Sequence, residues 1–184
     1  NLLDTVNFGS LNVTGTNVTI TEDSGTELTG VNATTFNLTA AGNITDSGNI
    51  AVTGLATFNA GGNMVVLGED AGETTNFGSL NVTGGIVTVT EDSGTTLAGV
   101  NATTFTLNTT GNIDNTNPVT IAVTGLGTFN ASGTITLGNN ALDTVNFGSL
   151  NVTGTTVAVT EDTAMTIAGA NATTLAMTAN GPIT

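Results

Sequence analysis

The chain has 184 residues, 14 carboxylates and no Lys, Arg or His, so its formal net charge is −14. Without cations it cannot neutralise phosphates, which excludes nucleic-acid binding, and without Lys, His or Cys it lacks P-loop, zinc-site and disulfide chemistry. A polybasic membrane anchor is also excluded, and no apolar run approaches the roughly 18 residues that predict insertion into a membrane.

A repeat of 69 to 70 residues organises the sequence. The segment Asn7-Phe8-Gly9-Ser10-Leu11-Asn12-Val13-Thr14-Gly15 recurs at 76–84 and at 146–154. We therefore read 1–184 as one continuous segment with units 7–75, 76–145 and a partial 146–184. Its first residues match 140–145 and its last residues match 42–45, so we expect the chain to be a fragment of a longer array of repeats.

Along the chain, apolar residues alternate with polar ones in short runs bounded by Gly, Asn, Asp and Ser. This period of two, rich in β-branched residues, is typical of half-buried strands of three to five residues. Asn12, Thr14, Thr19 and Thr21 are expected to face outward. The residues expected to face inward are Leu11, Val13, Val18, Ile20 and Leu28 in the first coil, and Phe36, Leu38, Ile44, Ile50 and Val52 in the second. Later strands are expected around Val87–Thr90, Ile121–Val123 and Thr134–Leu137.

Each unit divides into three shorter repeats of about 23 residues, such as those around Leu11, Phe36 and Phe58. A short coil cannot bury its own apolar face, so neighbouring coils must stack. The sequence therefore predicts an all-β fold, a parallel β-solenoid of about eight coils with three coils per unit. The coil length favours a right-handed β-helix over the left-handed type. The alternative is an antiparallel β-sandwich or a tandem array of small β domains.

The 23-residue period places one set of asparagines in a single outward column, where stacked amides would fix the register of the coils. The predicted ladder comprises Asn12, Asn37, Asn59, Asn81, Asn130 and Asn151.

The same period aligns five aspartates at a turn: Asp23, Asp46, Asp70, Asp92 and Asp162. One interpretation is that each caps its own turn, followed by a Gly that tolerates positive φ. The other is calcium held between stacked carboxylates, which would relieve their repulsion. No EF-hand or Gly-Gly-x-Gly-x-Asp pattern accompanies them.

Sequons for N-glycosylation are abundant, in part because the chain is rich in Asn and Thr. The candidate positions are Asn12, Asn17, Asn32, Asn37, Asn43, Asn81, Asn101, Asn108, Asn130, Asn151 and Asn171. Outward Thr-x-Thr pairs, such as Thr19/Thr21 and Thr88/Thr90, raise an ice-binding hypothesis, although Met64, Val66 and Ala158 interrupt the array.

The carboxylates argue against a catalytic centre. Glycosidases use one pair of carboxylates, whereas here the acids recur with the repeat, and no Tyr or Trp is present to stack on a sugar. We expect no catalytic residue, no enzymatic activity and no cofactor other than calcium.

The phrases at 7–15, at Ala41-Gly42-Asn43-Ile44-Thr45-Asp46-Ser47-Gly48 and at Ile50-Ala51-Val52-Thr53-Gly54 resemble the repeat regions of giant bacterial exoproteins. These are the filamentous-haemagglutinin-like and related β-strand-repeat surface adhesins, and the resemblance covers the whole chain. It implies a secreted right-handed β-helical shaft with roles in adhesion, aggregation or fibre formation, located outside the cell or at its surface.

Three hypotheses of function follow. The first is the structural shaft of an extracellular fibre or giant surface adhesin. Its partners would be further copies of the repeat, by self-association or end-to-end continuation, and a host or neighbouring-cell surface. The second is a carbohydrate- or protein-binding module on a β-helix, and the third is an ice-binding β-solenoid.

Overall fold

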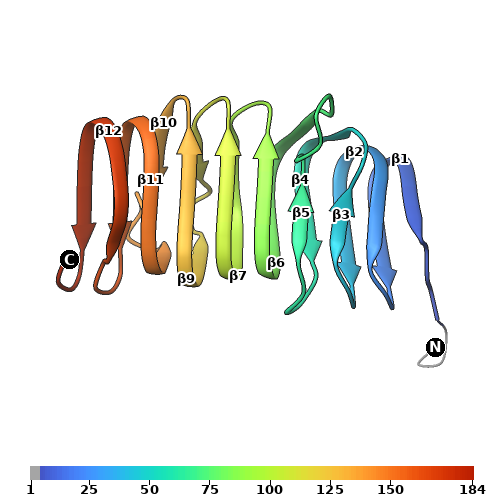
Figure 1. Ribbon diagram of the computed structural model, residues 1–184, viewed down its shortest axis with the longest axis horizontal. Helices are drawn as coiled ribbons and strands as arrows, with labels where there is room; N and C mark the ends of the chain where they lie inside the picture. The colour runs from blue at the N-terminus through green and yellow to red at the C-terminus, as the bar shows by residue number, and fades with distance from the viewer. Residues whose placement is uncertain (1–4) are drawn as a thin grey trace.

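The computed structural model describes residues 5–184, which wind as a stack of coils around a single axis (Figure 1). The first four residues of the predicted segment lie outside this range. The described residues form no helix, and hence none that could cross a membrane. The strands are β1 (Ser10–Glu22), β2 (Thr26–Ala40), β3 (Ile44–Asp46), β4 (Ile50–Asn59), β5 (Val65–Leu67), β6 (Thr75–Glu91), β7 (Thr95–Thr109), β8 (Ile113–Asn115), β9 (Thr120–Ala131), β10 (Thr134–Leu137), β11 (Thr144–Glu161) and β12 (Ile167–Ala179).

Every strand pairing in the described chain is parallel, which confirms the predicted β-solenoid. One column of paired residues runs Thr26–Ile44–Val65–Val87 through four successive coils. There are about nine turns spaced about 19 residues apart, which corrects the expected eight turns of about 23. The right-handed winding stays a prediction.

The coil length was wrong because the turns of the solenoid differ in length. Leu11 pairs with Leu28 after 17 residues, whereas Ile50 pairs with Thr75 after 25. The longer coil includes a loop, 68–74, that leaves the wall of the solenoid. Similar sequence motifs that are equally spaced along the chain therefore do not occupy the same position around the axis.

The strands are also longer than predicted, since β6 has 17 residues and β11 has 18. They continue through corners of the coil because pairing with the coils on either side continues there. Register shifts, such as the one between Val52 and Leu55, let the backbone bend without losing the ladder.

The predicted inward residues of the second coil are confirmed, because Phe36, Leu38, Ile44, Ile50 and Val52 are all buried. In the first coil, Leu11, Val13, Val18 and Ile20 point inward but stay partly exposed, because a coil covers them on one side only. Leu28 is buried, but it pairs with Leu11 and so belongs to the second coil, not to the first as predicted. The centre holds two files of phenylalanine with ring centroids 5.4–5.7 Å apart: Phe36–Phe58–Phe77 and Phe105–Phe129–Phe147. Burial of these rings and of β-branched side chains supplies the main stabilisation.

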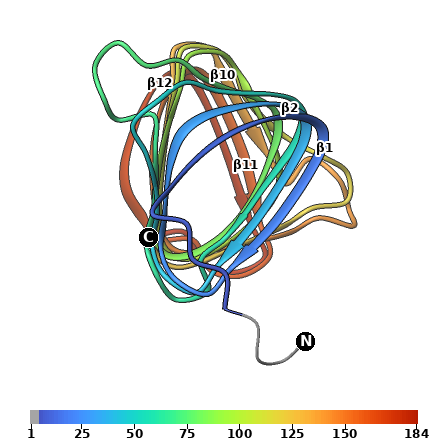
Figure 2. The same cartoon turned by 90° about the vertical axis from the view of Figure 1, so that its right-hand side faces the viewer.

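The 69-residue unit does not contain three whole coils, as predicted, but about three and a half. The column through Thr26 reaches Val87 after three coils, whereas the repeat copy of Thr26 is Thr95, almost half a coil further on. Equivalent residues of neighbouring units therefore lie on opposite sides of the solenoid. Figure 2 shows this down the axis, where the loop after β5 and the loop after β10 project from opposite sides.

Candidate functional site

Three acidic corners, one in each unit, hold neighbouring coils together. They are the sequences Glu22-Asp23, Glu91-Asp92 and Glu161-Asp162, at the ends of β1, β6 and β11. In each corner the aspartate binds the residue 17 positions earlier, on the preceding coil. Its Oδ2 accepts a hydrogen bond from that residue's N–H, at 2.8 Å for Val6, 2.9 Å for Thr75 and 2.7 Å for Val145. Its own N–H donates to the same residue's carbonyl oxygen, so the contact is closed in both directions.

The glutamates of these corners are buried, which is rare for a carboxylate without a cation. Each Oε1 accepts the N–H of a phenylalanine 14 residues earlier, at 2.9 Å for Phe8 and at 3.0 Å for Phe77 and Phe147. Each Oε1 also accepts the hydroxyl of the residue two positions on, Ser24, Ser93 or Thr163. Backbone and hydroxyl donors thus take the place of the missing Lys and Arg.

The three glutamates differ at their second oxygen. Glu91 Oε2 accepts the Thr95 hydroxyl. Glu161 Oε2, in the unit where Met165 stands at the position of Thr95, is buried without a hydrogen-bond partner. Glu22 Oε2 is also buried without a partner, although the first unit has Thr26 at that position. Burial raises the pKa of both Glu91 and Glu161, and the hydrogen bonds from the phenylalanine amides partly oppose this rise.

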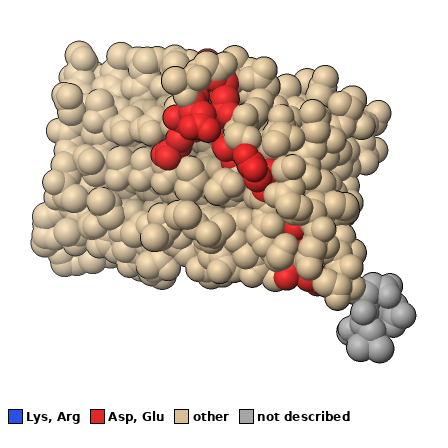
Figure 3. Space-filling model, turned by 45° about the vertical axis from the view of Figure 1, so that its right-hand side comes forward, with Lys and Arg blue, Asp and Glu red and all other residues tan. Residues whose placement is uncertain are grey.

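The predicted column of five aspartates is wrong, because these residues are not stacked, and calcium binding by them stays a prediction. Asp46 is paired with Leu28, Asp70 lies in the loop after β5, and Asp23, Asp92 and Asp162 each face a different backbone amide. On the face that Figure 3 shows, the carboxylates form an oblique band rather than a line along the axis. Within residues 5–184 no group of three acidic side chains is arranged to hold a metal ion.

The predicted asparagine ladder is also wrong, because the coils differ in length and a constant period of 23 residues does not align their side chains. Asn12, Asn81 and Asn151 each pair with a glycine, which leaves room for the amide. Asn37 lies between Thr19 and Thr57, and Asn59 between Thr39 and Thr83.

A shorter ladder does form around Asn130. Its Nδ2 donates to Asn108 Oδ1 at 2.8 Å, and Asn108 Nδ2 donates to Thr90 Oγ1 at 3.4 Å. These three residues belong to β9, β7 and β6, so the ladder joins three successive coils. It keeps the coils in register as expected of stacked amides, although Asn108 was foreseen only as a sequon.

The sequons fall into two groups. Exposed side chains belong to Asn12, Asn17, Asn32, Asn37, Asn43, Asn101 and Asn171, and half-buried ones to Asn81, Asn108, Asn130 and Asn151. Glycan on Asn108 or Asn130 would disrupt the ladder that these two residues form, so the exposed group remains the better set of candidates.

The threonine pairs do not build one face. Thr19 is followed in its column by Asn37 and Thr57, and Thr88 by Thr106 and Thr128. Because units are rotated by about half a coil, the first pair and its repeat copy lie on different sides. The column of Thr88 holds three threonines but ends at Val66 on one side and at Asn151 on the other, so no long threonine array forms within residues 5–184.

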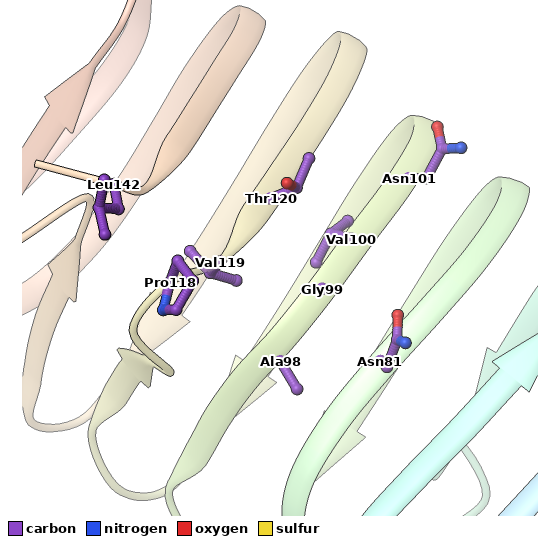
Figure 4. Close-up of a pocket in the computed structure, with 9 residues that line it drawn as sticks. All are labelled: Asn81, Ala98, Gly99, Val100, Asn101, Pro118, Val119, Thr120 and Leu142. Atoms are coloured by element: carbon purple, nitrogen blue, oxygen red, sulfur yellow. The ribbon is translucent and has the colours of Figure 1, made fainter. Parts of the chain in front are cut away.

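A shallow groove of about 550 Å³ crosses the wall between β6 and the loop after β10. Figure 4 shows its side chains spread over neighbouring coils, with the amides of Asn81 and Asn101 on β6 and β7, and Pro118 and Leu142 on two loops. It carries neither an ionisable nor an aromatic side chain. Its donors and acceptors are amides, hydroxyls and backbone groups, which suit a neutral polar ligand.

The chain belongs to the family described as repeats of unknown function (DUF5649), whose model matches residues 15–83 and 84–144. The two matches follow one another directly, and the first has the 69-residue length of the repeat. No curated protein and no solved structure matches the chain. The protein is therefore a repeat β-solenoid, and it is a member of this repeat family.

Proposed function

We propose that this chain forms the shaft of an extracellular fibre or giant surface adhesin. The observation that carries the proposal is the continuity of the solenoid: parallel pairing runs from β1 to β12 without a break, over one shared apolar core. A rod of this kind extends simply by adding repeats, since each coil contacts only its neighbours.

Several features favour a passive, exposed role. Carboxylates, phenylalanines and asparagines all serve to join one coil to the next, and the wall has no cation for proteases that cleave after Lys or Arg. The net charge of −14 would keep separate rods apart at low salt. The resemblance to filamentous-haemagglutinin-like adhesins agrees with a location at the cell surface.

The partner that suits such a rod is more of the same repeat. β1 and β12 each pair with only one neighbouring strand and present unpaired backbone groups. Inward-facing side chains are exposed there, including Phe8 at 42% and Leu175 at 47%. An open edge of this kind favours the addition of further coils, by continuation or by self-association.

Electron microscopy of chains that carry two, four and eight tandem units tests the proposal. Three and a half coils at about 4.8 Å predict an increase in rod length of about 17 Å per unit at constant width. Beads on a string, or particles that widen as units are added, would exclude a shaft. Immunogold labelling of intact cells with antibodies to this segment tests the location, and labelled surface filaments are the expected result.

The groove between β6 and the loop after β10 favours one alternative, a carbohydrate- or protein-binding module. The amides of Asn81 and Asn101 could then bind sugar hydroxyls. Glycan-array binding that is lost in Asn101→Ala would support this second function. An array without signal would exclude glycan binding and leave the shaft as the proposed function.

A further inference from the structure

The corner between β3 and the loop 68–74 contains a carboxylate with an unusual environment. Asp46, the last residue of β3, accepts the Gly68 N–H with both oxygens, at 3.0 and 3.1 Å. Gly68 has φ +72°, so the chain turns sharply there into the loop. The loop returns to the wall where Thr74 N–H donates to Asn49 Oδ1 at 2.9 Å.

The second unit contains the same corner with different chemistry. Asn115 replaces Asp46, and its Oδ1 accepts the N–H of Gly138, which has φ +70°. Its Nδ2 donates to Asp143 Oδ2 at 3.1 Å, and Asp143 is the repeat copy of Glu73. Asp143 Oδ1 also accepts the Val119 N–H at 3.0 Å. An amide–carboxylate hydrogen bond thus ties the second loop to its corner.

In the first unit the corresponding pair is two carboxylates, Asp46 and Glu73. An ionised Asp46 has no hydrogen to donate, and Glu73 Oε2 is removed from solvent without a hydrogen-bond partner. What the second unit supplies with the Asn115 amide, the first unit could supply only with a proton on one of the two acids.

The charges around Asp46 all have the same sign. Asp70 and Glu69 lie in the same loop as Glu73, and on β2 Glu27 lies next to Leu28, which pairs with Asp46. β5 presents Val65, Val66 and Leu67, and the chain has no Lys, Arg or His to offset the acids. Burial raises the pKa of Asp46 to about 6, repulsion from Glu73 and Asp70 adds to the rise, and the Gly68 bond opposes it.

We propose that Asp46 and Glu73 share one proton, which makes the loop 68–74 responsive to pH. With the proton present, the Asp46 hydroxyl donates to Glu73 and the loop is tied down as its counterpart is in the second unit. When the proton is lost to water, two carboxylates repel each other beside Asp70 and Glu69, and the loop loosens. The loop 138–143 has an amide in place of the proton and stays closed. This inference does not depend on the proposed function.

Amide hydrogen exchange on the full chain, in EDTA to exclude metals, tests the proposal. After correction for the intrinsic rate, exchange of the Thr74 amide, which donates to Asn49 where the loop returns to the wall, should rise about tenfold between pH 5 and pH 7.5. In Asp46→Asn, which copies the second unit, this rise should vanish. In Asn115→Asp, exchange of the Asp143 amide, which donates to the Asn140 carbonyl within the loop 138–143, should acquire it.

A carbon NMR titration of Asp46 gives an independent measurement. An apparent pKa close to 6 for the pair supports a shared proton, whereas titration of Asp46 near 4 would overturn it. The proposal would also be overturned if Asp46→Asn kept the wild-type pH dependence of loop exchange. Because both variants place residues that the repeat already uses at this position, they are expected to fold.

Discussion

Glycine in the sequence Phe-Gly-Ser allows two coils to approach where the ladder shifts register. On β4, Thr53 and Gly54 lie opposite the single residue Gly78 of β6, since Val52 pairs with Phe77 and Leu55 with Ser79. A Cβ on Gly78 would lie 2.2 Å from the Thr53 carbonyl oxygen and 2.9 Å from that of Gly54. Both neighbours are backbone atoms, so relief requires the coils to separate by about 1 Å.

We predict that Gly78→Ala destabilises the solenoid by about 1–3 kcal/mol, the usual cost of overpacking. In a chain of this size that corresponds to a fall of roughly 2–12 °C in Tm. The matched control is Gly9→Ala, at the same position of the first unit, where nothing lies within 4 Å of the added Cβ. Thermal unfolding followed by circular dichroism measures both. Equal Tm values for the two variants would refute the coil contact at Gly78.

Three further predictions test the corners and the core. Glu91→Ala should lower the free energy of unfolding in urea by about 3 kcal/mol or more, because it leaves buried hydrogen-bond donors without an acceptor. At the exposed position 69, Glu69→Ala should lower it by under about 0.5 kcal/mol. Phe129→Ala, which removes the middle ring of a file, should cost about 3–5 kcal/mol, and Phe8→Ala much less. Because the folded pKa of Glu161 is raised, the folded state holds its proton to higher pH than the unfolded state. Its contribution to stability should therefore fall as the pH rises through that folded pKa, and urea midpoints of Glu161→Gln across pH should lack this part of the decline.

The direction of most side chains could be predicted from the sequence, because a strand alternates faces whatever the length of its coil. Leu38 and Ile50 face the core for that reason, and Thr19 and Thr21 face solvent. The length of each coil could not be predicted, because it depends on how many residues a corner takes. The loop 68–74 adds residues to one coil, but the alternation of apolar and polar residues in the flanking strands does not show how many.

The candidate columns were wrong as a consequence of that uncertainty. Assigning Asn37 and Asn59 to one column required a constant coil, and a few residues of error move a side chain to a different neighbour. The buried role of Glu91 was missed for the same reason, because its donor, the Phe77 amide, is a neighbour only once the coil is closed. The constant separation of 14 residues between phenylalanine and glutamate in all three units was the signal that could have revealed it.

The register between coils is the central claim, and a disulfide can test it directly because the chain has no native cysteine. Thr88 on β6 pairs with Thr106 on β7, so their Cα atoms should be about 4.8 Å apart, within the range that a disulfide spans. Thr83, which a 23-residue coil would place beside Thr106, pairs instead with Asn101. Mass spectrometry after mild oxidation should find an intramolecular disulfide in the double variant Thr88→Cys/Thr106→Cys and none in Thr83→Cys/Thr106→Cys. The reverse result would contradict the coil register and the half-coil rotation of the units with it.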